Sequence, residues 1–328
     1  MKHFVVINPH SFTADSLKQF LADLDACFRA EGKVEYRTHI SRYPRDAIAA
    51  ISHYIQSLGS KDIVRVYAVG GDGILFDCLN GMVSFKNAEL TSVPYGNSND
   101  FIRAFGEKAA PAFRNIKKLI NAPSRPVDII HCGENYAINE VNIGLIGQSI
   151  VYANTLFPQL HQGFLRRNVG LAFSFCAIKA MFDDEIMRQH YTVIKDGEDF
   201  TGIYSNIHIA NAPCNGGKMV PCPQAKPDDG VLEVIFLGAV NKFTAIKSLG
   251  SYQKGRSNQI DAYRASRCTS MVVSSNETLC AQLDGEGFYA KEIRLEVVPS
   301  GINFFAPEGI DFEDYTKKSN YVRVGESK

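Results

Sequence analysis

A glycine-rich stretch has the residue types and spacing of a phosphate-binding turn, and its candidate residues are Gly70, Gly71, Asp72, Gly73 and Ile74. It follows an apolar run over residues 63–69 that predicts a buried strand, and it precedes apolar residues at helical spacing through Met82. A strand, a glycine turn and a helix start together direct backbone N–H groups at an anion. No Gly-Lys-Ser/Thr follows, so the turn is not a Walker loop. The alternative is a tight turn in which Asp72 is simply solvated.

A second polar turn follows one strand later, in the segment Pro-Tyr-Gly-Asn-Ser-Asn-Asp-Phe at 94–101. Residues 90–93 predict a strand, and Asn97 or Ser98 is a candidate cap for a helix that runs through Phe105. Two successive parallel strands end at the same edge of a sheet, which is where open α/β sheets bind ligands.

Two acids far along the chain could take up a proton. Asp284 and Glu286 flank Gly285, and if residues 283–288 are extended, the two carboxylates share one face. Two close carboxylates raise the pKa of one of them, which suits a proton acceptor. A hairpin turn at this position is the alternative. A phosphate cradle, a cation and a proton acceptor are what phosphoryl transfer requires.

The elements that position these residues indicate two domains, the default for 328 residues. Strands and helices alternate up to residue 129, which predicts a parallel sheet with helices on both faces. The expected elements here include a strand at 34–38 and helices at 44–58 and 109–120. Residues 130–306 predict a mainly antiparallel β-sandwich, because short β-branched and aromatic runs alternate with turn residues. It is interrupted by one helix at about 165–182, and the tail 307–328 returns to the first domain or frays.

Composition excludes several classes of protein. The formal net charge is zero, so no bulk field attracts nucleic acid. The eight cysteines form no CxxC pair, which favours free thiols in a reducing compartment. No signal peptide precedes the first strand, and no apolar stretch is long enough to span a membrane. We therefore expect a cytoplasmic protein without a transmembrane segment, which meets lipid, if at all, from the membrane surface.

The set of motifs resembles the diacylglycerol kinase catalytic family, which includes bacterial lipid kinases and sphingosine kinases and is more distantly similar to NAD kinases and phosphofructokinases. The similarity lies in NPxS near the N-terminus, GGDG at 70–73 and PxGNSNDF at 94–101. Further blocks follow in the family's order: SRPVDII at 124–130, INEVNIG at 138–144, the stretch 209–234 and LDGEGF at 283–288.

This resemblance implies that ATP binds at the glycine turn and at a first loop made of Asn8, Pro9, His10 and Ser11. In the family a Thr or Ser near position 41 assists, which here is Ser41, with Thr38 as the alternative. Asn97 stands where the family usually has Thr.

The resemblance also implies a magnesium site, built from the Asp229 carboxylate and the backbone carbonyls of Lys226 and Val231. Hard oxygen ligands suit Mg²⁺, although Asp-Asp-Gly is also an ordinary turn between strands.

For the proton acceptor the resemblance points to Glu286, while other branches of the family assign that role to the acid of the glycine loop, here Asp72. Asp100 and Asp128 match acids that support the family's network of water and metal.

The chain departs from the family pattern at several positions, which here hold Phe12, Ile74, Phe76, Asp77 and Ile146. The family loop runs GGDGT, and Ile74 cannot donate a hydrogen bond to phosphate as Thr would. Each such loss reduces phosphate or metal support.

Three functions follow as hypotheses. The first is an ATP- and Mg²⁺-dependent kinase of a diacylglycerol- or sphingoid-like lipid alcohol at the membrane surface. The second is a kinase of a soluble metabolite, disfavoured because NAD kinases carry Asn-Glu where this chain has Asn99-Asp100. The third is a non-catalytic nucleotide-binding protein. A homodimer is an expectation that no feature of the sequence decides.

Lipid contact, if it occurs, is expected near 157–182, where an apolar stretch follows aromatic and basic residues. Those residues are Phe157, Phe164, Arg166 and Arg167. A buried core helix is the alternative.

Overall fold

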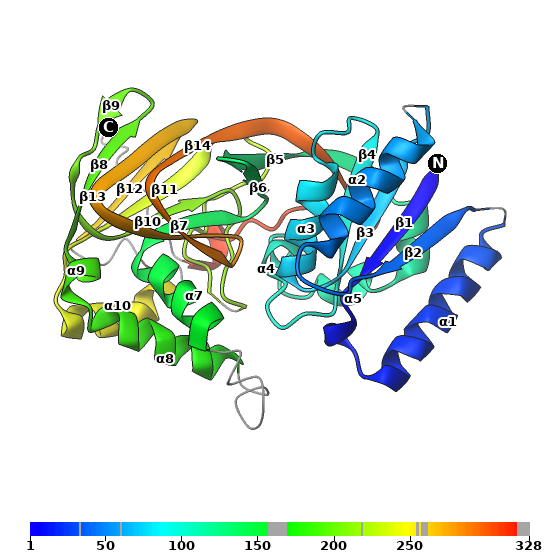
Figure 1. The fold of residues 1–328 in the computed structure, drawn as a ribbon, viewed down its shortest axis with the longest axis horizontal. Helices are drawn as coiled ribbons and strands as arrows, with labels where there is room; N and C mark the ends of the chain where they lie inside the picture. The colour runs from blue at the N-terminus through cyan, green and yellow to red at the C-terminus, as the bar shows by residue number, and fades with distance from the viewer. Residues whose placement is uncertain are drawn as a thin grey trace. The chain divides into compact units, whose positions relative to one another are not determined.

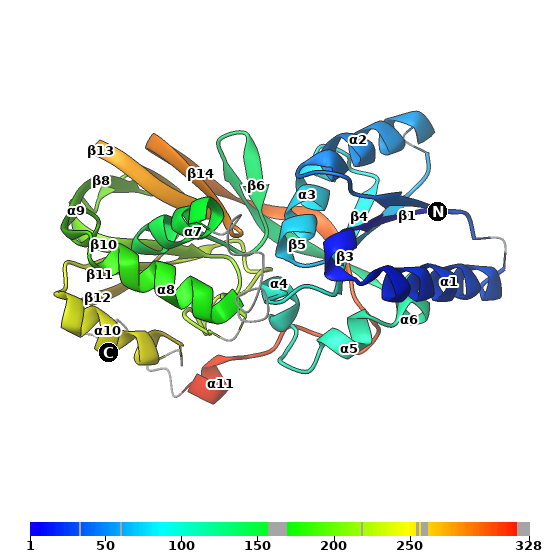
Figure 2. The same ribbon diagram turned by 60° about the horizontal axis from the view of Figure 1, so that its bottom comes forward.

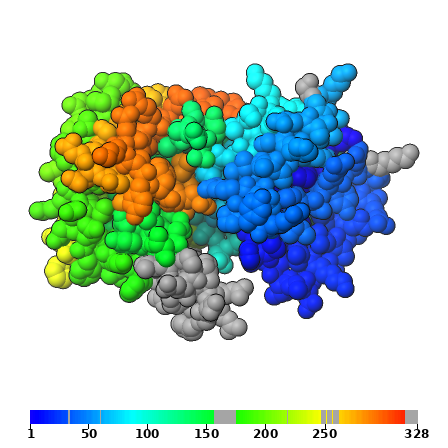
Figure 3. All heavy atoms as spheres, in the orientation of Figure 1, coloured from blue at the N-terminus to red at the C-terminus, as the bar shows by residue number. Residues whose placement is uncertain are grey.

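The computed structural model describes residues 1–32, 34–59, 61–156, 169–217, 219–253, 256 and 262–319. The chain divides into two compact units. Unit 1 contains Met1–Ile129 and Pro299–Glu313, and unit 2 contains Ile130–Val298 and Asp314–Lys328. Both are drawn as ribbons in Figure 1 and as spheres in Figure 3.

Unit 1 is built on a parallel sheet. Its strands are β1 (Lys2–Ile7), β2 (Tyr36–Ile40), β3 (Val64–Gly70) and β4 (Ala88–Pro94). They lie in the order β4-β3-β1-β2, and each adjacent pair is parallel. Every residue of β3 is buried, as expected for a strand covered on both faces.

Three longer helices cover this sheet: α1 (Ala14–Ala30), α2 (Asp46–Leu58) and α3 (Asp72–Met82). Figure 2 shows α2 and α3 on one face of the sheet and α1 on the other. A capping box between Thr13 and Ser16 begins α1. The predicted α/β class is therefore confirmed, although β2 begins two residues later than the expected strand 34–38.

Shorter helices follow β4, and two predictions are wrong here. The helix expected to run through Phe105 after a cap at Asn97 or Ser98 is only α4 (Asp100–Arg103), because Asn99 has a left-handed φ of 51°. The expected single helix over 109–120 is two helices, α5 (Ala110–Phe113) and α6 (Ile116–Ile120). Asn115 separates them, since its side chain accepts a hydrogen bond from the N–H of Lys118 and caps α6.

Residues 299–313 belong to unit 1, whereas the sequence analysis assigned 130–306 to the second domain. They contain the end of β14 (Glu286–Phe305), which pairs in parallel with β4 through Phe304 and Leu90. The Phe304 ring contacts Phe101, Phe105 and Phe113. This aromatic cluster is the physical reason that the segment returns to unit 1.

Unit 2 contains a mainly antiparallel sheet, as predicted, in the order β12-β11-β10-β7-β13-β14. Its longer strands are β7 (Glu140–Gly144), β8 (Gln189–Lys195), β10 (Gly202–Ala210), β11 (Leu232–Gly238), β12 (Tyr263–Cys268) and β13 (Ser270–Leu283). β8 pairs with β10 and β13, and also with the short β9 (Glu198–Asp199). β5 (Ser124–Cys132) begins in unit 1 and ends in unit 2, where its last residues pair with β6 (Asn135–Ala137).

Unit 2 has more helix than predicted. The described elements are α7 (Leu145–Leu156), α8 (Val169–Met181), α9 (Asp184–Met187), α10 (Lys242–Gln253) and α11 (Thr316–Ser319). Only α8 overlaps the one helix expected at 165–182, so the prediction of a single helical interruption is wrong. The lipid-contact candidates Phe157, Phe164, Arg166 and Arg167 lie outside the described residues. No helix in the described part of the chain is long and apolar enough to cross a membrane.

Candidate active site

The two glycine turns of unit 1 are bonded to each other through Gly70. Its carbonyl oxygen accepts the N–H groups of Tyr95 at 2.8 Å and Gly96 at 2.9 Å. Gly70 ends β3 with a φ of 152°, and α3 begins two residues later. A helix leaves its first N–H groups without acceptors inside the helix. The structure therefore places both predicted turns at the carboxyl ends of adjacent parallel strands.

Gly71 and Gly96 lie in direct backbone contact. A Cβ on Gly96 would stand 2.2 Å from the Cα of Gly71, closer than any side chain tolerates. Asn99 supports the second turn, because its Oδ1 accepts from the Gly96 N–H at 3.1 Å and its Nδ2 donates to the Gly96 oxygen at 2.7 Å. Gly96 is thus required by space, whereas a Cβ on Gly71 would make a tight contact, 3.1 Å from the Gly96 Cα.

Asp72 joins the first turn to the second. Its Oδ1 accepts the backbone N–H of Asp100 at 2.7 Å. From its sequence context Asp72 could hold a metal through water or fix the turn by accepting backbone N–H groups, and the bond to Asp100 is of the second kind. The supported backbone is that of the neighbouring turn rather than its own.

The first loop lies at the same edge of the sheet. Asn8 follows β1 and donates its N–H to the Val69 oxygen at 2.9 Å, and its side chain accepts the N–H of His10 within the short 3₁₀ turn Pro9–Ser11. Ser11 lies beside Gly70, with Oγ 3.2 Å from where a Cβ would stand there.

The remaining candidate residues for the nucleotide site are Ser41, its alternative Thr38, and Asn97. Ser41 donates its N–H to the Ile7 oxygen at 2.9 Å and so lies at the sheet edge. Thr38, the alternative, pairs with Val5 in the middle of β2, away from that edge. Asn97 is exposed in the second turn.

The departures from the family pattern have packing roles. Phe76 is buried, and the Arg45 guanidinium lies 4.4 Å above its ring. Arg45 Nη1 pairs with Asp77 Oδ1 at 2.9 Å, and burial raises the pKa of Asp77. Phe12 packs on Tyr95 with ring centroids 4.7 Å apart. Ile74 is buried against Gly70.

In unit 2, Asp284 and Gly285 form the two-residue hairpin turn between β13 and β14, so the extended arrangement predicted for 283–288 is wrong. Both have positive φ, 47° and 91°, and Leu283 pairs with Glu286 across the turn. Asp-Gly is a favoured pair for such turns because both positions need φ above zero. Asp284 and Glu286 therefore do not share one face of a strand.

Three backbone N–H groups hold the Asp284 carboxylate. Oδ1 accepts from Asn139 at 3.0 Å and Glu140 at 2.8 Å, and Oδ2 accepts from Ile138 at 2.7 Å. Burial raises the pKa of Asp284 to about 7, although these donors oppose the shift. The shift comes from burial and, more weakly, from Glu140, so the expected cause, the charge of Glu286, is not among those found.

Two further candidate acids are Glu286 in unit 2 and Asp128 in unit 1. Glu286 is the first residue of β14 and is partly buried. Asp128 in β5 is buried, and its Oδ1 accepts the N–H of Ser300 at 2.7 Å. Asp128 therefore fastens the returning segment to unit 1.

The candidate magnesium residues form a turn before β11. Asp229 Oδ1 accepts the N–H of Val231 at 3.3 Å, and Oδ2 lies 3.8 Å from Arg267 Nη2. Lys226, whose carbonyl was the third candidate, is exposed three residues earlier. Within the described residues, no group of three or more His, Cys, Asp or Glu side chains could hold a metal. The eight cysteines are all free.

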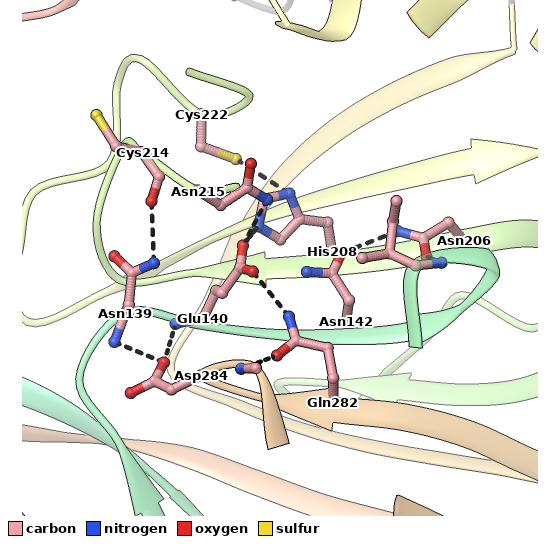
Figure 4. A network of polar contacts seen from close by, with 12 residues as sticks. Asn139, Glu140, Asn142, Asn206, His208, Cys214, Asn215, Cys222, Gln282 and Asp284 are labelled. Carbon is pink, nitrogen blue, oxygen red and sulfur yellow. Dashed lines mark hydrogen bonds and ion pairs between the residues drawn. The ribbon is translucent and has the colours of Figure 1, made fainter. Parts of the chain in front are cut away.

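A buried polar network adjoins Asp284, and sequence reasoning missed it (Figure 4). At its centre, Glu140 Oε2 lies 2.7 Å from His208 Nε2, and Glu140 Oε1 accepts from Gln282 Nε2 at 2.7 Å. The sequence signal for it is a titratable or amide side chain in each of three strands, namely Glu140, His208 and Gln282.

Comparisons with known proteins agree with this architecture. A model described as "Diacylglycerol kinase catalytic domain" matches residues 2–132, and one described as "YegS C-terminal NAD kinase beta sandwich-like domain" matches 160–306. A protein of Alcanivorax borkumensis named "Probable lipid kinase YegS-like" is 23% identical over 262 residues, 78% of this chain and 83% of that protein. A protein of the same name from Pseudomonas putida is 27% identical over 251 residues, 75% of this chain and 78% of that protein.

Among solved structures, a diacylglycerol kinase from Bacillus anthracis has the same fold. It aligns with a TM-score of 0.65 and 18% identity, over 94% of this chain and 98% of its own. This chain therefore contains a diacylglycerol kinase catalytic domain over residues 2–132, followed by a YegS-type C-terminal β-sandwich-like domain over 160–306.

Proposed function

We propose that this protein transfers the γ-phosphoryl group of ATP to a hydroxyl of a diacylglycerol- or sphingoid-like lipid. The observation that carries the proposal is the contact between Gly71 and Gly96, which brings two glycine turns together at the carboxyl ends of β3 and β4. The curated relatives named probable lipid kinases support the choice of acceptor.

The donor phosphates would bind at the start of α3. Backbone N–H groups of its first turn face the sheet edge, where the helix dipole favours an anion. Glycine at 70, 71 and 73 leaves room for a phosphate oxygen to approach the backbone. The loop Asn8–Ser11 and Ser41 lie at this edge and would contact the nucleotide.

Mg²⁺ would neutralise negative charge on the donor phosphates. The turn 226–231 fits the ion in its chemistry, because Asp229 supplies a carboxylate and the backbone supplies carbonyl oxygens. Arg267, 3.8 Å from Asp229 Oδ2, is the cation that already faces this carboxylate.

Asp284 is our choice for the proton acceptor, in place of Glu286. A general base works best when its pKa lies near the operating pH, and burial raises that of Asp284 to about 7. Its carboxylate is also fixed in orientation, because Oδ1 accepts two N–H groups and Oδ2 accepts one. Ionised carboxylates accept about four hydrogen bonds, which leaves capacity for a substrate hydroxyl.

The test is to incubate the purified protein with a bacterial lipid extract, Mg²⁺ and ATP labelled in the γ-phosphate. We expect the label in the organic phase, on lipids whose mass increases by one phosphate. Asp284→Asn should abolish the product while ATP still raises the melting temperature. Label that appears only in the aqueous phase would contradict a lipid acceptor and favour a soluble metabolite.

A non-catalytic nucleotide-binding role is the second candidate, because Ile74 is buried against Gly70 and has no hydroxyl for a phosphate. ATP binding without turnover on any lipid would favour this role. Activity that emerges in Ile74→Thr would favour it further.

A further inference from the structure

Glu140 and His208 form a buried pair that the proposed reaction does not use directly. They lie on the adjacent strands β7 and β10, where Glu140 pairs with Ala210 and His208 with Asn142. His208 Nε2 is 2.7 Å from Glu140 Oε2, with side-chain exposures of 1% and 10%. A buried carboxylate is costly unless partners satisfy it.

Two amide donors complete the surroundings of the Glu140 carboxylate. Asn215 Nδ2 donates to Oε2 at 2.8 Å, and Gln282 Nε2 donates to Oε1 at 2.7 Å. The donors come from the loop after β10 and from β13, so this one carboxylate joins segments that are distant in sequence. Figure 4 shows them converging on Glu140.

The same residue holds the Asp284 turn by two routes. Through its backbone, Glu140 donates its N–H to Asp284 Oδ1 at 2.8 Å and accepts the Asp284 N–H at 3.1 Å. Through its side chain it holds Gln282, whose Oε1 accepts the N–H of Gly285 at 2.6 Å. The position of the turn therefore depends on the side chain of Glu140 as well as on the strand pairing.

We infer that the Glu140–His208 pair is a positioning unit that holds Asp284 for proton transfer, with Gln282 as the link. This inference rests on the proposed function, since it gives Asp284 the role of proton acceptor. The His208 ring keeps Glu140 in place, and Glu140 in turn sets the position and the electrostatic surroundings of Asp284.

Several titratable groups face this cluster. They are Glu140 on β7, His208 on β10, Cys222 in the loop before β11 and Glu233 on β11, whose charge acts on Cys222. Cys222 Sγ lies 4.0 Å from His208 Nδ1, and burial raises the pKa of its thiol. Cys222 is therefore a neutral neighbour, whereas the charge of Glu140 adds to burial in raising the pKa of Asp284.

The test measures Asp284 in two ways. Its carboxylate is titrated by NMR in protein with ¹³C-labelled aspartate, assigned by comparison with Asp284→Asn, and the pH dependence of kcat is measured in parallel. Removing the Glu140 charge favours ionised Asp284. In Glu140→Gln we therefore expect both midpoints to move down by about one pH unit, a tenfold change in proton affinity.

The second pair of variants tests positioning. His208→Leu removes the partner of Glu140, and kcat should fall on the order of tenfold or more with the KM for ATP unchanged, because small displacements of a reacting group are costly. His208→Gln keeps a polar side chain near the place of Nε2 and should restore most of kcat. His190→Gln, at an exposed histidine on β8, is the matched control.

Unchanged midpoints in Glu140→Gln, together with wild-type kcat in His208→Leu, would overturn the inference. If Glu140→Gln does not fold, Gln282→Met is tested in its place. That change removes the hydrogen bonds that join Glu140 to the Asp284 turn and keeps the carboxyl groups of Glu140 and Asp284. Wild-type kcat in Gln282→Met would equally overturn the inference. If the wild-type protein phosphorylates no lipid, the proposed function fails by itself, and the NMR titration still decides whether Glu140 acts on Asp284.

Discussion

Asp284 combines two properties that seldom occur together in one carboxylate. Three backbone N–H groups fix its orientation, yet burial raises its pKa to about 7. The first property gives a defined direction for proton transfer, and the second makes the group basic enough to accept a proton near neutral pH. The left-handed turn at Asp284 and Gly285 is what places the carboxylate against residues 138–140.

The pH dependence of the reaction follows from this carboxylate. Ionised Asp284 is the form that accepts a proton, so kcat should fall as the pH drops through about 7. Asp284→Asn should lower kcat at least about a hundredfold, the usual contribution of a general base. Steady-state rates between pH 5.5 and 9 are the measurement. Asp15→Asn, at an exposed acid, is the control, and a flat profile for the wild type would exclude Asp284 as the base.

The glycine contact allows an equally local prediction. In Gly96→Ala the new Cβ would stand 2.2 Å from the Gly71 Cα, so one of the two turns must move. We expect a loss of about 1–3 kcal/mol in the free energy of unfolding and a loss of ATP binding. Chemical denaturation and calorimetric titration measure the two effects. Gly238→Ala, where the nearest atom would be 3.4 Å away, should leave both unchanged.

At the scale of elements, the edge formed by β3, β4 and α3 depends on the bond from Asp72 to the Asp100 N–H. That bond ties the start of α3 to the start of α4, and α4 has only four residues to hold itself in place. The glycine turns are therefore one connected structure in which each turn supports the other.

Two substitutions separate the structural role of Asp72 from its charge. Asp72→Asn keeps an acceptor for the Asp100 N–H and should unfold like the wild type, whereas Asp72→Ala should lose about 1 kcal/mol of stability. If the charge also serves the reaction, both variants lose kcat. Urea denaturation beside activity assays gives the two readouts, and equal stability of all three proteins would show that the bond contributes nothing.

The sequence predicted those parts of the site that depend on local residue types. Glycines at 70, 71 and 96 predicted tight turns at strand ends, and the structure has them there. The Asp-Gly pair at 284–285 is itself a hairpin signal, and it is a better guide to this turn than the alternation of acids that favours an extended strand. The Glu140–His208 pair could not be predicted, because its contact depends on the register between β7 and β10.

At the scale of the whole molecule, the chain leaves unit 1 after residue 129 and returns to it at 299–313. The return is held by Phe304, which is fully buried among other aromatic rings, and by the bond between Asp128 and the N–H of Ser300. Unit 1 therefore needs residues 299–313 in addition to residues 1–129 to complete its core.

This dependence predicts a large cost for a change near the C-terminus. Phe304→Ala should destabilise unit 1 by about 3–5 kcal/mol, since it leaves a cavity among packed rings. Phe243→Ala, at a ring that is 87% exposed, is the control and should have little effect. Thermal unfolding followed by calorimetry measures both. A wild-type melting curve for Phe304→Ala would mean that unit 1 folds without the returning segment.

The central claim is that backbone N–H groups at the end of β3 bind the phosphates of ATP. Amide hydrogen exchange, measured by NMR with and without saturating ATP and Mg²⁺, tests it residue by residue. The account predicts that ATP slows exchange at Gly71, Asp72, Gly73 and Ile74 and in the second turn at 95–99. ATP that binds tightly, as shown by calorimetry, yet slows exchange only elsewhere in the protein would contradict it.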